Sequence, residues 1–192
     1  NGAHQRTNAA AAIMALEVLR QYYAILVDPD ELAEGLRNAT WPGRLEMVSR
    51  EPRILLDGAH NPEGMEALAD ALRDVYRFER LNVMLAMMPN KNHEHSLRHI
   101  LPMVDTLVIT EPDFHKKMNA DELADVAKSL RESLGRPLNI VTEPDWRRAL
   151  ARLLETENAS SGTTLNVVTG TLYLIADVRS WLLHGSNSEK GW

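Results

Sequence analysis

The strongest constraint on the fold is a regular alternation, between residues 46 and 184, of short apolar segments with longer amphipathic ones. The apolar segments are bounded by turns and are apolar almost throughout, which is typical of strands buried on both faces. They read "RILLD", "LNVMLAM", "DTLVIT", "LNIVT" and "LNVVT". Strands of this kind, separated by helices, predict an α/β fold with a Rossmann-like, mostly parallel sheet and helices on both faces.

One edge of this sheet is expected to be antiparallel. The segments "LEMVS" and "RILLD" are separated only by a turn around Pro52, whereas a parallel pair needs a long crossover connection. Helix starts are also marked. Asn61 is followed by a proline, as at a capped helix start, and Asn119 with Glu122 resembles a capping box. We expect Gly135 to end the second of these helices.

The first forty residues form a separate part of the pattern. Residues 5–23 are rich in helix formers and poor in polar side chains, so we expect a helix buried on most sides against a larger partner. A second short helix is expected over residues 29–36, where Asp28 supplies the cap. The Pro-Gly turn in "NATWPGR" marks a boundary between residues 1–40 and 41–192. The chain opens inside a helical pattern and without methionine, so we expect it to belong to a longer protein.

Composition narrows the class of protein. The chain has 192 residues, of which 44% are hydrophobic and 25% are charged, and its net charge is −6. An acidic balance disfavours a nucleic-acid partner, and no apolar run is long enough to span a membrane. The sequence shows no secretory leader pattern. It contains no cysteine, so thiolate chemistry is excluded and a reducing, cytoplasmic location is expected.

Ligands of such sheets bind beyond the carboxyl ends of the strands, so the polar residues at those ends form the candidate site. The stretch "LLDGAHNPEG" places three of them at one strand-to-helix turn, where Asn61 is better explained as a helix cap. For Asp57 and His60, a bracing role and a ligand-binding role remain equally open. The other candidates follow the other strands: Asn90, Lys91, Asn92, Thr110, Glu111 and Thr169 to Thr171.

Several known site motifs are absent. There is no G-x-G-x-x-G, no G-x-x-x-x-G-K-[ST] phosphate loop and no G-x-S-x-G elbow. A nicotinamide dinucleotide site and an α/β-hydrolase are therefore disfavoured. His95 and His99 stand four residues apart, a spacing that can chelate zinc on a helix. No third ligand is evident, so "HEHSLRH", which begins at His93, is interpreted as a solvated helix start, and no metal site is predicted.

Five motifs, in order along the chain, carry a resemblance to a known family: "GAHQRTNAA", "WPGRLE", "LLDGAHNPEG", "MPNKN" and "VVTGTLYLIADVR". The set resembles folylpolyglutamate synthase, with or without dihydrofolate synthase activity, in the Mur ligase superfamily. "DGAHNP" together with "PGR-x-E" is specific, and the motifs span nearly the whole chain. The resemblance implies the C-terminal domain of such an enzyme over residues 41–192. Over residues 1–40 it implies the last helices of the central ATPase domain.

In this family ATP activates the carboxylate of a folate as an acyl phosphate, and the amine of glutamate then attacks it to give an amide. The resemblance therefore implies an ATP-dependent ligase of folate and one-carbon metabolism. Its substrates would be ATP, glutamate and a folate, either dihydropteroate or a tetrahydrofolate. Magnesium would be bound mainly by the N-terminal part of the enzyme, which also holds the phosphate loop. Because that loop is missing here, we expect this chain to be inactive alone.

Carried over motif by motif, the resemblance assigns a role to six side chains. Asn8 would meet the nucleotide base, Arg44 the phosphates, and Asp57 the ribose. His60 is the one candidate catalytic residue, placed near the incoming amine. The glutamate pocket would be formed by three side chains: His60, Lys91 and Thr171.

Two positions depart from the family pattern. Family members show M-x-D-K-D where this chain has "MPNKN", so Asn90 and Asn92 replace two acids while Lys91 is kept. The family T-G-S becomes T-G-T, in which Thr171 keeps a hydroxyl but is stiffer. Two other functions remain open. One is a cell-wall ligase of the Mur type with another acceptor amino acid, and the other is a ligand-binding or docking domain without catalysis.

Overall fold

The computed structural model describes residues 2–158 and 163–185. These residues contain a six-stranded sheet with the strand order β1-β2-β6-β3-β4-β5. β1 pairs antiparallel with β2, and every other pair of neighbours is parallel. The predicted mostly parallel sheet with one antiparallel edge strand is confirmed. The strands are β1 (Glu46–Arg50), β2 (Arg53–Leu56), β3 (Arg80–Leu85), β4 (Thr106–Glu111), β5 (Asn139–Asp145) and β6 (Thr164–Thr169).

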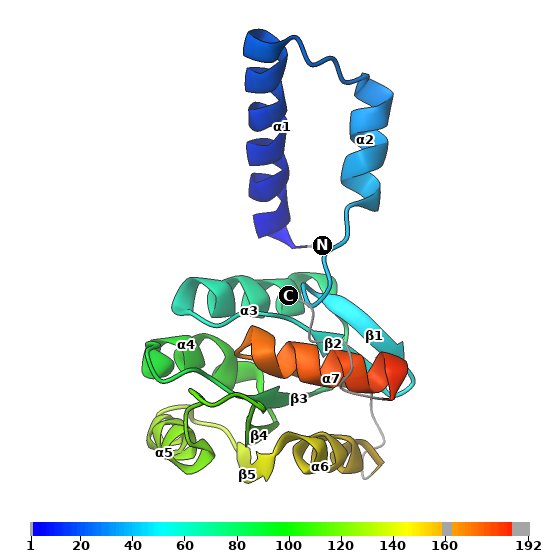
Figure 1. The fold of residues 1–192 in the computed structure, drawn as a ribbon. Helices are drawn as coiled ribbons and strands as arrows, with labels where there is room; N and C mark the ends of the chain where they lie inside the picture. The colour runs from blue at the N-terminus through cyan, green and yellow to red at the C-terminus, as the bar shows by residue number, and fades with distance from the viewer. Residues whose placement is uncertain (1, 159–162, 186–192) are drawn as a thin grey trace.

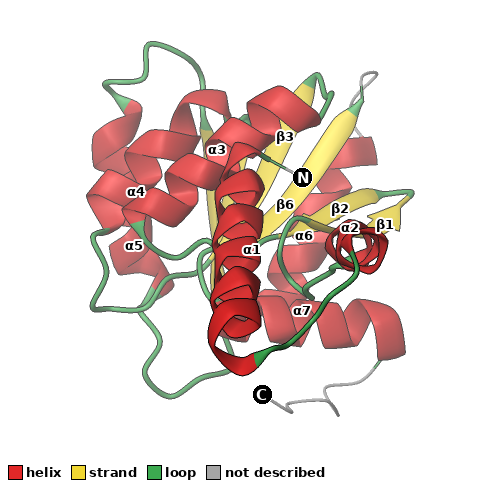
Figure 2. Cartoon of the chain, turned by 90° about the horizontal axis from the view of Figure 1, so that it is seen from above, coloured by secondary structure: helices red, strands yellow, loops and turns green. Residues whose placement is uncertain are grey.

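Helices cover both faces of the sheet, as predicted (Figures 1 and 2). One face packs against α3 (Pro62–Val75), α4 (His93–Ile100) and α5 (Ala120–Arg131), and a short 3-10 helix, η1 (Leu101–Met103), follows α4. The other face packs against α6 (Trp146–Asn158) and α7 (Leu172–His184).

The two cores share the strands residue by residue. Leu55 of β2 belongs to the core under α3, α4 and α5, whereas its neighbours Ile54 and Leu56 belong to the core under α6 and α7. Successive side chains of a strand point to opposite faces. Helices cover both faces here, so nearly every position of such a strand is apolar. Among the exceptions are Asn82 of β3 and Asn166 of β6, which are buried and whose side-chain amides bond to each other at 3.1 Å.

The two helix-start signals lie at real helix starts. The Oδ1 atom of Asn61 accepts the N–H of Gly64 at 2.8 Å, where α3 begins. The Oδ1 atom of Asn119 accepts the N–H groups of Asp121 and Glu122 at 2.8 and 3.2 Å, where α5 begins. Each bond satisfies a donor that the first helical turn leaves without a partner.

The predicted end of α5 at Gly135 is wrong, because the helix ends at Arg131. Shortly after it, two N–H groups bond three residues back, from Ser133 to the carbonyl of Leu130 and from Leu134 to that of Arg131. Bonds of this type belong to a tightened 3-10 turn, so the α-helix has already closed when the chain reaches the glycine.

α1 (Ala3–Tyr23) and α2 (Pro29–Asn38) stand apart from the sheet (Figure 1). The main contact of α1 with the other elements is with α3. Apolar side chains of this region are open to solvent, among them Met14 at 69% and Leu26 at 83% exposure. The expected burial of the first helix is therefore not found among residues 2–158 and 163–185. None of the described helices is both long and apolar enough to cross a membrane.

Candidate functional site

Three loops meet at the carboxyl edge of the sheet, around Gly170. The N–H of Gly170 donates to the carbonyl of Ala59, in the loop after β2, at 2.9 Å. Gly170 also lies against the loop after β3, since a Cβ atom there would stand 2.2 Å from the carbonyl oxygen of Ala86. With a φ of 101°, this position suits glycine alone. The loops after β2, β3 and β6 are thereby held side by side.

The position of β6 makes this edge the expected place for a ligand. β6 lies between β2 and β3. The helix that follows β6, α7, covers one face of the sheet, whereas α3 and α4, which follow β2 and β3, cover the other. Neighbouring parallel strands whose helices leave to opposite faces open a crevice beyond their carboxyl ends, and α/β proteins bind ligands there.

Asp57 braces the turn between β2 and α3. Its carboxylate accepts the N–H of Leu45 at 3.0 Å and the N–H of Ala59 at 2.9 Å, and the residue is 8% exposed. The hydroxyl of Tyr76 lies 3.5 Å from the carbonyl oxygen of Leu45. Burial, and then the Asp57 carboxylate, raise the pKa of that hydroxyl. Asp57 thus joins the loop before β1 to the loop after β2.

Arg44 lies on the loop before β1, and its side chain reaches the turn that Asp57 braces. A Cβ atom on Gly58 would stand 2.8 Å from Nη1 of Arg44, so the guanidinium lies over the backbone of that glycine. Among residues 2–158 and 163–185, neither Arg44 nor Lys91 forms an ion pair. A guanidinium that is exposed and lacks a carboxylate is available to a phosphate.

His60 is half-buried beside these groups. Its Nδ1 lies 2.8 Å from the carbonyl oxygen of Gly58. A carbonyl oxygen only accepts, so Nδ1 carries a hydrogen and Nε2 is the ring atom left for a ligand. The backbone of the loop thereby fixes the orientation of the ring, as a proton acceptor or a substrate contact at this edge requires.

The loop after β3 carries Lys91 and the two asparagines that replace acids. Asn92 caps α4, because its Oδ1 accepts the N–H of His95 at 3.1 Å. Asparagine and aspartate serve equally well as caps, so this substitution keeps the local structure. Asn90 is exposed in the turn. Lys91 is partly exposed between them.

Thr171 caps α7, since its Oγ1 accepts the N–H of Tyr173 at 3.3 Å. The residue is only 3% exposed. Thr169 is also buried, and its hydroxyl donates to the carbonyl of Ala59 at 3.3 Å. Both hydroxyls therefore have structural partners, that of Thr171 in the first turn of α7 and that of Thr169 in the loop after β2.

The polar residues at the end of β4, Thr110 and Glu111, also bond to other parts of the chain. One carboxylate oxygen of Glu111 accepts the N–H of Ala120 at 3.0 Å, and the other lies 2.9 Å from the ammonium of Lys117. Burial acts to raise the pKa of Glu111, but these two partners together hold it below its usual value. The hydroxyl of Thr110 donates to the carbonyl of Pro144.

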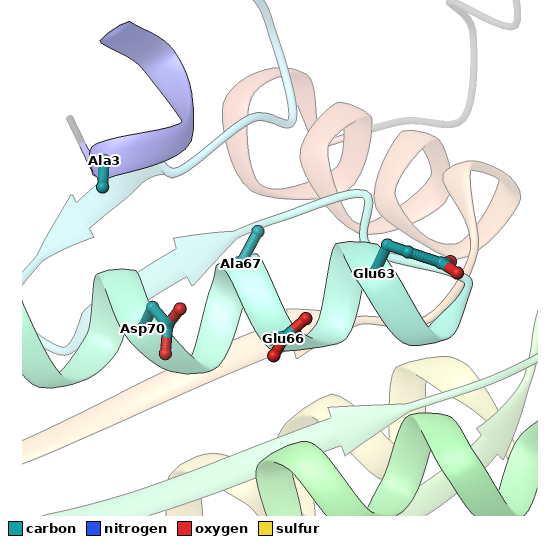
Figure 3. Close-up of a pocket in the computed structure, with 5 residues that line it drawn as sticks. All are labelled: Ala3, Glu63, Glu66, Ala67 and Asp70. Atoms are coloured by element: carbon teal, nitrogen blue, oxygen red, sulfur yellow. The ribbon is translucent and has the colours of Figure 1, made fainter. Parts of the chain in front are cut away.

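Asn8 is not brought to this edge with the other predicted residues. It lies exposed on α1, and its amide donates to the side chain of Gln5 at 3.3 Å. A pocket does lie where α1 meets α3, but its polar lining is acidic (Figure 3). In that view Ala67 faces the first turn of α1. The lining residues are Ala3, Glu63, Glu66, Ala67 and Asp70.

The histidines of α4 do not gather into a metal site. The rings of His95 and His99 stack with their centroids 5.2 Å apart. His93 turns away, and its Nε2 lies 2.8 Å from the carbonyl oxygen of Met88. Across the described ranges, no three His, Cys, Asp or Glu side chains are grouped so that they could hold a metal ion.

The residues that fix the Arg44 loop were missed in the sequence. Glu46 accepts the N–H of Gly43 at 2.7 Å and pairs with Arg179 of α7 at 2.9 Å. Asp177, also on α7, holds a different loop, because it accepts the N–H of Asp113, after β4, at 3.1 Å. Glu46 stands in the "PGR-x-E" motif, which is a local signal. Asp177 and Arg179 stand in the "VVTGTLYLIADVR" motif, but the motif does not indicate their partners, which are distant in the sequence.

The chain is similar to known proteins over most of its length. A family model described as "Mur ligase, glutamate ligase domain" matches residues 43–171. The dihydrofolate synthase/folylpolyglutamate synthase of Bacillus subtilis is 31% identical over 181 residues, which is 94% of this chain and 40% of that protein.

Solved structures agree with the sequence comparison. The structure of folylpolyglutamate synthase from Mycobacterium tuberculosis complexed with ADP and AMPPCP is similar with a TM-score of 0.83. It is 26% identical, over 96% of this chain and 41% of that one. Folylpolyglutamate synthase from Thermotoga maritima gives a TM-score of 0.73 at 29% identity, over 98% and 41%. The chain thus spans about two fifths of the length of these relatives.

Proposed function

This chain belongs to the family of Mur ligase glutamate ligase domains, and from that premise we propose that it acts within a longer, ATP-dependent ligase that adds glutamate to a folate. The observation that carries the proposal is the gathering of Arg44, His60 and Lys91 on adjoining loops at the switch point of the sheet. The substrates of such a ligase, ATP and glutamate, are anions. Arg44 and Lys91 are cations that form no ion pair among the described residues, so this edge of the sheet suits such substrates.

The proposal divides the chain into two parts. Residues 1–40 would be the terminal helices of a central ATPase domain, and residues 41–192 would be the C-terminal domain. The exposed apolar side chains of α1 and α2 support this division, because helices of that kind are stable when another part of a protein covers them. The enzyme would work in the cytoplasm.

In the proposed reaction, a carboxylate oxygen of the folate takes the γ-phosphoryl group of ATP and ADP leaves. The glutamate amine then attacks the carbonyl carbon, the bond to the phosphate oxygen breaks, and the amine gives up a proton. Arg44 would stabilise the charge on the transferring phosphate, which is the main task of a protein in phosphoryl transfer. Nε2 of His60 would contact the amine or take its proton.

Other contacts with the nucleotide follow from the same proposal. Asp57 would contact the ribose in addition to bracing the turn, and Asn8 would reach the base only when the two parts of the chain close around ATP. Magnesium accompanies ATP in such reactions and would be held by the phosphate-loop domain. In the described residues, no group of three acidic or histidine side chains competes for that role.

Lys91 and Thr171 would bind the incoming glutamate. Both follow strands that are neighbours in the sheet, β3 and β6, so their loops converge on one ligand. In the longer ligase, Lys91→Met is expected to raise the KM for glutamate by about tenfold or more while the KM for ATP stays nearly constant. Steady-state kinetics with ATP and folate saturating measure this. An unchanged glutamate KM would mean that the "MPNKN" loop has lost the role.

The ligase function is tested by the release of ADP. A protein that joins this chain to a phosphate-loop domain is expected to release ADP only when folate and glutamate are both present. ADP release with a cell-wall precursor instead of folate would favour a Mur-type ligase of the cell wall. No ADP release with either substrate would favour a docking domain. The purified 192-residue chain is expected to show no turnover, because it contains no phosphate loop. Turnover by that chain would refute this division of labour.

A further inference from the structure

Arg179, on α7, is tied to the loop that carries Arg44. The Nε atom of Arg179 donates to both carboxylate oxygens of Glu46, at 2.9 and 3.1 Å. The Oε2 atom of Glu46 also accepts the N–H of Gly43 at 2.7 Å. The side chains of the ion pair are only 26% and 25% exposed, so solvent screens it less than an open surface pair.

The loop that this pair holds contains strained backbone next to Arg44. Leu45 is a buried, bulky residue with a φ of 45°, which is rare for any residue but glycine. Backbone of this kind persists only where the surroundings fix it. Asp57 fixes it on one side, through the N–H of Leu45, and Glu46 fixes it on the other, through the N–H of Gly43.

We propose that Arg179 is a positioning residue for Arg44. It holds the Glu46 carboxylate against the loop backbone, and the loop then presents the Arg44 guanidinium over Gly58. It also neutralises Glu46, so that this carboxylate does not compete with a phosphate for the guanidinium two residues away. The inference rests on the proposed function, because it takes Arg44 as a phosphate contact.

The test is a double-mutant cycle in the longer ligase. Arg179→Met is expected to lower kcat/KM for ATP roughly tenfold while the KM for glutamate stays constant. In an enzyme that already carries Arg44→Ala, the same change is expected to have little further effect, because residues that act through one another are not additive. Arg179→Lys, which restores a positive charge beside Glu46, is expected to recover part of the loss.

A matched ion pair at the opposite edge of the sheet provides the control. Arg136 pairs with Asp105 at 2.5 Å, with side-chain exposures of 32% and 31%. Asp105 also accepts a backbone N–H, that of Leu81, at 2.8 Å. Arg136→Met therefore removes a pair of similar burial and similar bracing role, and it is expected to leave kcat/KM for ATP unchanged.

The outcomes separate the inference from the proposed function. If Arg44→Ala lowers kcat/KM for ATP but Arg179→Met does not, or if the two losses multiply in the double variant, the positioning role is overturned and the function stands. If Arg44→Ala itself has no effect on ATP kinetics, both fail. Glu46→Gln is the second variant should Arg179→Met not fold. It keeps an acceptor for Gly43 and is expected to reproduce a milder loss for ATP alone, and an unchanged value would contradict the inference.

Discussion

Replacing Gly170 with alanine is expected to lower the free energy of unfolding of this chain by about 3 kcal/mol or more, because the change adds a direct clash to a strained backbone. At its φ of 101°, a Cβ atom would stand 2.2 Å from the carbonyl oxygen of Ala86 and 2.6 Å from Cδ1 of Leu85. The oxygen belongs to the main chain, so relief requires the loops after β3 and β6 to separate. Urea unfolding followed by tryptophan fluorescence measures the change.

Gly135 is the matched control. It too has a positive φ, of 65°, but no atom lies within 4 Å of the position that a Cβ would take. Gly135→Ala should therefore lower the free energy of unfolding by about 1 kcal/mol, through the unfavourable backbone conformation alone. A loss at Gly170 no larger than the loss at Gly135 would show that the loops at the carboxyl edge are less tightly joined than the contact with Ala86 indicates.

In a ligase that contains this chain, Arg44→Ala is expected to lower kcat and kcat/KM for ATP together, by about 100-fold. The side chain is exposed, lies over Gly58, and has no ion-pair partner in the described part of the chain. Losing this side chain should therefore lower the free energy of unfolding by no more than about 0.5 kcal/mol. The loss of its positive charge should affect only the stabilisation of the transferring phosphate. Steady-state kinetics and thermal unfolding of the same preparation measure both quantities.

Arg148→Ala controls for the loss of an exposed arginine, since Arg148 lies on α6 and should affect neither quantity. Arg44→Lys keeps the charge without the planar fork and is expected to fall between wild type and Arg44→Ala. Unchanged kinetics together with a lower melting temperature for Arg44→Ala would make Arg44 a turn residue and would remove the nucleotide role.

Except for the end of α5, the sequence was sufficient to predict the strands of the sheet, the helices that cover it and the class of sheet, because these follow from local patterns. Apolar strands, the cap at Asn61 and the short turn around Pro52 each carry their own signal, and the parallel sheet with an antiparallel edge follows from them. The order of the strands has no such signal. The position of β6 between β2 and β3 depends on pairings such as Leu55 with Val167. No local sequence pattern indicates these pairings.

The candidate site shows the same division. Ligands of parallel sheets bind at the carboxyl ends of the strands, and this rule alone predicts that His60, Lys91 and Thr171 lie near one another, because it requires only the positions of the strand ends. It left open whether Asp57 braces or binds, and the bracing bonds to two backbone N–H groups are visible only in three dimensions. Arg179 was missed because its partner, Glu46, lies 133 residues away along the chain.

The place of β6 in the sheet also bears on how the chain folds. β6 comes after the other five described strands along the chain, yet it separates β2 from β3. Until it arrives, β2 and β3 each present an unpaired edge of main-chain donors and acceptors, which is the surface on which incomplete chains aggregate. Pairings that span so much sequence are formed late and slowly, since the intervening loop must be closed first. A ribosome that stops before residue 164 would release a chain whose two halves have no strand to join them.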